Sequence, residues 1–154
     1  MHLLCFNLKD KEYAVNIDGV REVRRIKAVT PIPGTLDFIE GVVSLRGKVV
    51  PIVNLRKKLG LDSEHGTVFH RVLIVEAHSH ILGIAVDSIV GVITVDPANI
   101  EAPDEILRKA EYLVGVTKIG KRLILVADIE KLLSLEDKTG LSHIHSKVEL
   151  KKRV

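Results

Sequence analysis

The sequence predicts an all-β protein, and three observations support this class. The chain contains 21 Val and 16 Ile but only five aromatic residues, and β-branched side chains lose less conformational freedom in strands than in helices. Short apolar runs bounded by turn residues recur along the chain, which is typical of sandwiches and barrels. A repeat of about 70 residues indicates two similar units.

Ten runs are expected to form strands and two to form short helices. The expected strands are, in order, 3–8, 12–17, 20–26, 38–45, 48–53, 69–77, 80–87, 89–95, 111–119 and 122–127. Helices are expected over 54–60 and 128–136, because Asn54 and Asp128 can accept hydrogen bonds from backbone N–H groups of the first turn. The segment TPIPGT at 30–35 is expected to be a connector, since Pro cannot donate to a central strand.

The two halves of the chain resemble each other. Residues 40–59 align without a gap on residues 114–133, and residues 14–23 align on residues 83–92. Gly41 falls on Gly115 and Asn54 on Asp128, so a turn glycine and a capping side chain recur. This repeat predicts two small barrels, although apolar segments separated by turns align with one another readily.

The chain of 154 residues is expected to fold as one domain over 1–137, followed by a basic tail over 138–154. The subdomain barrels are expected at roughly 1–68 and 69–137, with their interlocking left open. The tail carries a net charge of +4, which leaves about −1 for the domain. We expect a solvated tail, and contact with an anionic membrane surface is the alternative.

The cysteine content and the apolar runs indicate a soluble protein of a reducing compartment, expected to be cytoplasmic. Cys5 is the only cysteine, which excludes an intrachain disulfide. The LLC at 3–5 follows no basic or apolar leader, and the apolar stretch 81–95 is too short to span a bilayer and contains Asp87.

No catalytic motif is recognisable, so we expect no enzyme, no cofactor and no metal site. Cys5 lies in an apolar strand without charged neighbours, which favours an inert thiol. His78 and His80, like His143 and His145, form two-histidine spacings without further grouped ligands. Solvated loop histidines are the expectation for both pairs.

A nucleic-acid-binding barrel is the rival from another class. Such barrels use basic grooves and stacking aromatic side chains. The chain has five aromatic residues, and its excess positive charge lies in the tail rather than in the domain. The electrostatic footprint of nucleic-acid binding is therefore missing from the domain.

Arg46 poses the main functional question of the sequence. It lies in GVVSLRGKVVPIVNL, residues 41–55, where Gly47 can supply the positive φ of a tight hairpin turn. An arginine at such a tip either meets water or recognises a partner, and the turn alone does not decide between these. We hypothesise that Arg46 pairs with Glu22 and holds the hairpin against the 20–26 strand.

From end to end the chain resembles the CheW-like coupling proteins of bacterial chemotaxis. The segments that carry the resemblance are YAVNIDGVREV (13–23), TPIPGTLDFIEGVVSLRGKVVPIVNL (30–55), GIAVDSIVGV (83–92) and EYLVGVTKIGKRLILVADIEKLL (111–133). The family motif Asn-Leu-Arg-Gly, followed by two apolar residues and Pro, is here SLRGKVVP. Ser44 replaces the usual Asn and removes an amide donor at the strand end.

The resemblance implies two five-stranded, Src-homology-3-like barrels packed on a shared hydrophobic core, with one or two short helices. It implies a non-catalytic adaptor that links chemoreceptor tips to the regulatory domain of a CheA-type histidine kinase, a monomer alone that joins receptor–kinase arrays at the membrane without inserting. Couplers of twitching or gliding pathways remain an alternative. It further implies receptor contact near Val20, Glu22, Arg46 and Gly47, and kinase contact through Leu4, Ile17 and Val20.

Overall fold

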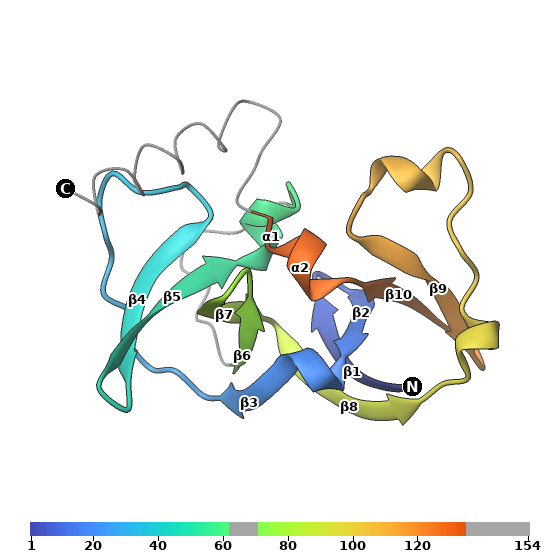
Figure 1. Cartoon of the computed structure of the whole chain (residues 1–154), viewed down its shortest axis with the longest axis horizontal. Helices are drawn as coiled ribbons and strands as arrows, with labels where there is room; N and C mark the ends of the chain where they lie inside the picture. Colours follow the sequence, from blue (N-terminus) through green and yellow to red (C-terminus); the bar gives the residue numbers. More distant parts are fainter. Residues whose placement is uncertain (62–70, 135–154) are drawn as a thin grey trace.

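The computed structural model describes residues 1–61 and 71–134, which fold into ten strands, two α-helices and three 3₁₀ turns (Figure 1). The strands are β1 (His2–Leu8), β2 (Lys11–Asn16), β3 (Val20–Arg24), β4 (Ile39–Leu45), β5 (Lys48–Asn54), β6 (Arg71–Ala77), β7 (His80–Val86), β8 (Ser88–Thr94), β9 (Leu113–Ile119) and β10 (Arg122–Ala127). The helical elements are η1 (Ile17–Gly19), α1 (Leu55–Lys58), η2 (Pro97–Asn99), η3 (Leu107–Lys109) and α2 (Ile129–Leu132). The prediction of an all-β protein with short helices is confirmed.

The strands form two five-stranded sheets. The first sheet has the order β8-β1-β2-β10-β9 and the second has the order β3-β6-β7-β5-β4. Figure 1 shows them side by side, the second sheet at the left and the first at the right. Each sheet takes strands from both halves of the chain, so neither half forms a sheet by itself. The expected subdomain boundary near residues 68 and 69 lies outside the described residues.

The internal repeat is present in the topology. Strands β1 to β5 correspond in order to strands β6 to β10. When each strand is exchanged for its counterpart, the order of the first sheet becomes the order of the second. In both sheets the central junction is a parallel pair, β2 with β10 and β5 with β7, whereas the other pairs are antiparallel.

The two predicted helix caps are also equivalent in the structure. Asn54 accepts a hydrogen bond from the backbone N–H of Lys57 at 3.2 Å, and Asp128 accepts one from Lys131 at the same distance. Each cap satisfies a first-turn N–H group that has no partner inside the helix. The helices therefore begin where the sequence predicts.

A shared core joins the sheets. Its buried side chains include Phe6 and Val15 of the first sheet and Leu73 and Ile84 of the second. Each sheet also has one smaller cluster on its inner face. In the first sheet the cluster lies around Leu3, Cys5 and Ile124, and in the second it lies around Ile52, Val72 and Ile74. Because successive residues of a strand point to opposite faces, β1 and β6 bury one face in the shared core and the other in their own sheet.

The hydrogen-bonded pairings leave both sheets open, rather than closed as barrels. Among the described residues, β3 does not pair with β4 and β8 does not pair with β9, so these four are edge strands. The gap between the two unpaired edge strands of a sheet, β3 and β4 or β8 and β9, is called its seam. Each seam is partly covered by the connection that follows β3 or β8. In the second sheet that connection carries Ile26 and Val29 onto the inner cluster, and Thr30 then bridges to Val42 of β4.

Gly41 and Gly115 make the close approach of these connections possible. A Cβ atom on Gly115 would lie 2.3 Å from the backbone oxygen of Glu101, and one on Gly41 would lie 2.1 Å from that of Thr30. The same backbone oxygens accept hydrogen bonds of 2.9 Å from Val116 and Val42. The repeated glycines are therefore required by space.

The substitution Gly115→Ala is expected to lower the free energy of unfolding by about 3 kcal/mol, because the new methyl group overlaps a hydrogen-bonded carbonyl. Gly120→Ala is the matched control, because a Cβ atom on Gly120 would meet no other atom within 4 Å. The φ of Gly120 is 60°, so this substitution should lower the free energy of unfolding by about 1 kcal/mol through the left-handed backbone alone. Urea unfolding followed by circular dichroism measures both. An equal loss in the two variants would contradict the steric explanation.

Cys5 lies in the inner cluster of the first sheet and is 0% exposed. The pKa of its thiol is raised from 9.0 to about 11, first by burial and then by the negative charge of Glu12, while the positive charge of Arg122 partly opposes the shift. Since the thiolate is the reactive form, the folded thiol is expected to react with a disulfide reagent at about pH 8 only after unfolding.

This expectation is checked by comparing the labelling rate in buffer with the rate in denaturant. The thiol loses its proton at a lower pH in the unfolded chain than in the folded protein, so the free energy of unfolding should also fall as pH rises from 9 toward 11. Cys5→Ala should make this fall smaller. Fast labelling of the folded protein would show that the thiol is accessible.

Candidate protein-interaction site

Arg46 and Gly47 form the two-residue turn between β4 and β5. Leu45 pairs with Lys48 across the hairpin, and the turn residues have φ angles of 50° and 77°. Two positive φ angles define the turn type whose twist matches antiparallel strands. Gly47 adopts this backbone freely, whereas Arg46 does so at a steric cost. The pairing continues unbroken through exposed Ser44, so the Ser at this position leaves the hairpin register intact.

The predicted pairing of Arg46 with Glu22 is present. The Nη2 atom of Arg46 donates to Oε2 of Glu22 at 3.1 Å, and the Nε atom of Arg24 donates to Oε1 of the same carboxylate at 3.2 Å. The side chain of Glu22 is 25% exposed, while that of Arg46 is 76% exposed. Glu22 is thus held between two guanidinium groups, and Arg46 keeps most of its surface free for a partner.

This ion pair connects opposite edges of the second sheet. Glu22 lies on β3 and Arg46 follows β4, the two strands at the ends of the sheet order. The pair therefore spans the open seam and joins strands that have no backbone pairing. Sequence reasoning missed Arg24, although its spacing of two from Glu22 on a strand places both side chains on one face.

The first sheet has no such pair at the equivalent positions. Gly91 stands where Glu22 stands, as their pairings with Cys5 and Ile74 show, and Gly120 opens the β9–β10 turn where Arg46 opens the other. The fold therefore does not require an ion pair at this seam. Its presence in one sheet only marks the β3–β4 seam as a distinct surface.

The remaining predicted contact residues differ in exposure. Val20 is half-buried at the start of β3 and packs against the shared core, and Ile17 is half-buried in η1. Leu4 was expected to contact the kinase, but its side chain is 5% exposed and belongs to the shared core. Leu4 is therefore not an exposed contact residue, because its strand is covered on both faces.

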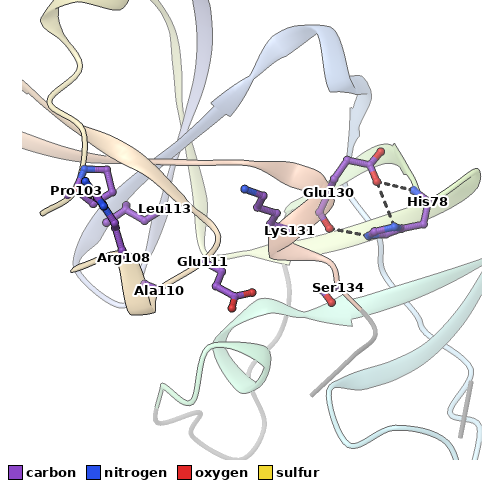
Figure 2. Close-up of a pocket in the computed structure, with 9 residues that line it drawn as sticks. All are labelled: His78, Pro103, Arg108, Ala110, Glu111, Leu113, Glu130, Lys131 and Ser134. Carbon is purple, nitrogen blue, oxygen red and sulfur yellow. Dashed lines mark hydrogen bonds and ion pairs between the residues drawn. The ribbon is translucent and has the colours of Figure 1, made fainter. Parts of the chain in front are cut away.

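A second surface feature is a pocket of about 480 Å³ between the β6–β7 hairpin, α2 and the β8–β9 connection (Figure 2). Its lining comprises His78, Pro103, Arg108, Ala110, Glu111, Leu113, Glu130, Lys131 and Ser134. His78 is exposed and lies in the β6–β7 turn, as expected of a loop histidine. In addition, its backbone N–H donates to Oε2 of Glu130 at 2.9 Å, and its ring Nε2 lies 2.6 Å from the Glu130 backbone oxygen. These bonds attach the hairpin of one sheet to the helix that follows the other.

The described residues contain no group of three or more His, Cys, Asp or Glu side chains that could hold a metal ion. Within those same residues, no helix has the length and apolar character needed to cross a membrane. His143, His145 and the basic tail lie outside the described residues.

Comparison with known proteins identifies the family. The CheW-like domain profile matches residues 2–137. The chemotaxis protein CheW of Klebsiella aerogenes is 37% identical over 139 residues, which cover 87% of this chain and 82% of the relative. Protein FrzA of Myxococcus xanthus is 30% identical over 135 residues, which cover 84% of this chain and 82% of the relative.

A solved structure agrees with these matches. The scaffolding protein TtCheW from Thermoanaerobacter tengcongensis superimposes with a TM-score of 0.79 and 30% identity, covering 89% of this chain and 94% of that chain. The motif segments, the repeated sheet order and these matches lead to one conclusion. The chain belongs to the CheW-like domain family.

Proposed function

We propose that the protein is a non-catalytic adaptor that couples chemoreceptors to a CheA-type histidine kinase in chemotaxis. The observation that carries the proposal is the Arg46–Glu22 pair, which occupies the seam of one sheet and is absent from the equivalent seam of the other. An exposed ion pair contributes only about 0–1 kcal/mol to stability. Recognition explains this pair better than stability does.

The receptor surface is proposed to comprise Val20, Glu22, Arg46 and Gly47. Chemoreceptor tips are helical, and a helix binds to a surface that offers apolar and polar contacts side by side. Val20 supplies the apolar contact, the ion pair fixes the hairpin tip, and exposed Gly47 allows close approach. All four residues lie on β3 or on the β4–β5 hairpin, so one partner can contact them together.

The kinase surface is proposed to include Ile17 and Val20. Leu4 is proposed to support this surface from the shared core, against which Val20 packs. A hollow of about 280 Å³ beside η1 provides a place for an apolar anchor. Its lining includes Gly19, Val114 and Ile129, which come from η1, β9 and α2. Val20 belongs to both proposed surfaces, so the two surfaces adjoin there, and Arg46 belongs to the receptor surface alone.

A second pathway is kept as an alternative for the same adaptor role. The likeness to protein FrzA, which is not named for chemotaxis, favours related receptor–kinase systems such as those of gliding or twitching motility. In either pathway the protein is proposed to act in the cytoplasm, as a monomer that is recruited to membrane receptor arrays.

The first prediction from this proposal concerns Arg46. Arg46→Ala is expected to weaken binding to the cytoplasmic fragment of the cognate receptor about tenfold or more, because the hairpin loses its anchor to β3, while the free energy of unfolding changes by less than about 1 kcal/mol. The double variant Arg46→Glu, Glu22→Arg restores the pair and should recover part of the affinity. Unchanged binding by Arg46→Ala would return Arg46 to the role of a turn residue.

The second prediction concerns the kinase. Calorimetric titration against the regulatory domain of the cognate CheA-type kinase should show 1:1 binding with a dissociation constant of about 1 μM or below, typical of a specific protein pair. Ile17→Lys should weaken it strongly, whereas Ile106→Lys, a change at a site that is 77% exposed, should not. Absence of any heat of binding with folded protein would refute the kinase partner.

A further inference from the structure

The seam of the second sheet carries an excess of positive charge that the fold does not require. Four basic residues lie in the segments around the Arg46–Glu22 pair, and with Arg46 they are called the basic edge: Arg24, Arg25, Lys27, Arg46 and Lys48. The segments 20–30 and 45–49 contain a single carboxylate, Glu22. That carboxylate is already shared by Arg24 and Arg46.

The basic residues come together because of topology. Arg24 ends β3, and the chain then crosses the seam through Arg25 and Lys27 before Thr30 bridges to Val42 of β4. Arg46 and Lys48 enter from the hairpin that the ion pair draws to β3. Arg25, Lys27 and Lys48 are exposed and have no side-chain hydrogen bond or ion pair with any other described residue.

The equivalent seam of the first sheet has a different charge. Asp96 follows β8 where Lys27 follows β3, and Gly120 stands in place of Arg46. Arg122, the counterpart of Lys48, is paired with Glu12. Among the described residues, Arg25, Lys27 and Lys48 thus have no side-chain partner, whereas the equivalent positions of the first sheet hold Thr94, Asp96 and the paired Arg122.

We propose that the basic edge binds an acidic stretch of a helical protein partner, and that this partner is the receptor tip. The inference rests on the proposed receptor contact at Arg46 and names the chemistry of the surface it meets. Val23 precedes Arg24 on β3 and Val49 follows Lys48 on β5; they are 42% and 69% exposed and suit the apolar side chains of a helix. Neither segment of the edge contains an aromatic residue to stack on a nucleic-acid base.

The test uses charge reversal away from the Arg46–Glu22 pair. Arg25→Glu with Lys27→Glu removes two unpaired cations from the edge, and Lys118→Glu with Lys121→Glu makes the same change in charge on exposed positions of the β9–β10 hairpin. Binding of each full-length protein to the cytoplasmic fragment of the cognate receptor is measured from about 50 to about 300 mM salt, a range over which screening increases. Lys48→Glu is a third, independent variant on the hairpin.

The edge variants should weaken binding about tenfold at low salt, and their dissociation constants should approach the wild-type value at high salt. The dissociation constant of the Lys118/Lys121 control variant should stay within about twofold of the wild-type value. Equal weakening by the control would mean that total charge, rather than the edge, is what the partner senses, and would overturn the proposal.

Two further outcomes separate the proposal from its alternatives. Normal receptor binding by the edge variants would refute the acidic partner surface while leaving the adaptor function standing, whereas no binding by the wild-type protein would refute both. Sedimentation with phosphatidylserine vesicles is run in parallel. A loss of vesicle binding with unchanged receptor affinity would assign the edge to an anionic membrane and overturn the proposal.

Discussion

The structure depends on two parallel strand pairs, β2 with β10 and β5 with β7. Each pair joins a strand of one half of the chain to a strand of the other, so each half completes the sheet that the other begins. A parallel pair needs a long connection, and the intervening strands supply it. Because the halves exchange strands in this way, neither can form its complete sheet without the other, and the shared core follows directly.

The exchange also explains the composition. Strands β1 and β6 are covered on both faces. The run LLCF at 3–6 is therefore apolar at every position: Leu4 and Phe6 lie in the shared core, while Leu3 and Cys5 lie in the inner cluster of the first sheet. Small and β-branched side chains fill these thin layers more easily than aromatic ones. The edge strands β3 and β8 instead alternate between half-buried and exposed residues, as strands with one solvated face do.

Function is best sought where the two similar sheets differ. The seam of the second sheet has Glu22 and Arg46 where the first has Gly91 and Gly120. A more buried ion pair, Arg56 with Asp87, ties α1 to the link between β7 and β8, with Nε and Oδ1 2.9 Å apart. In that pair the arginine side chain is 18% exposed and joins two elements of the fold, whereas the side chain of Arg46 is 76% exposed and available to a partner.

The sequence by itself determined the strands, the capped helices and the repeat, because periodicity and turn chemistry act over short distances or recur in matched segments. It supplied the Arg46–Glu22 pairing only as a hypothesis, which the structure bears out. Only the tertiary structure decided which half supplies which strand, since pairing partners many residues apart leave no local signal. It also decided that Leu4 is buried and that Arg24 shares Glu22. Burial depends on what covers a strand, and that covering is made by the other half of the chain.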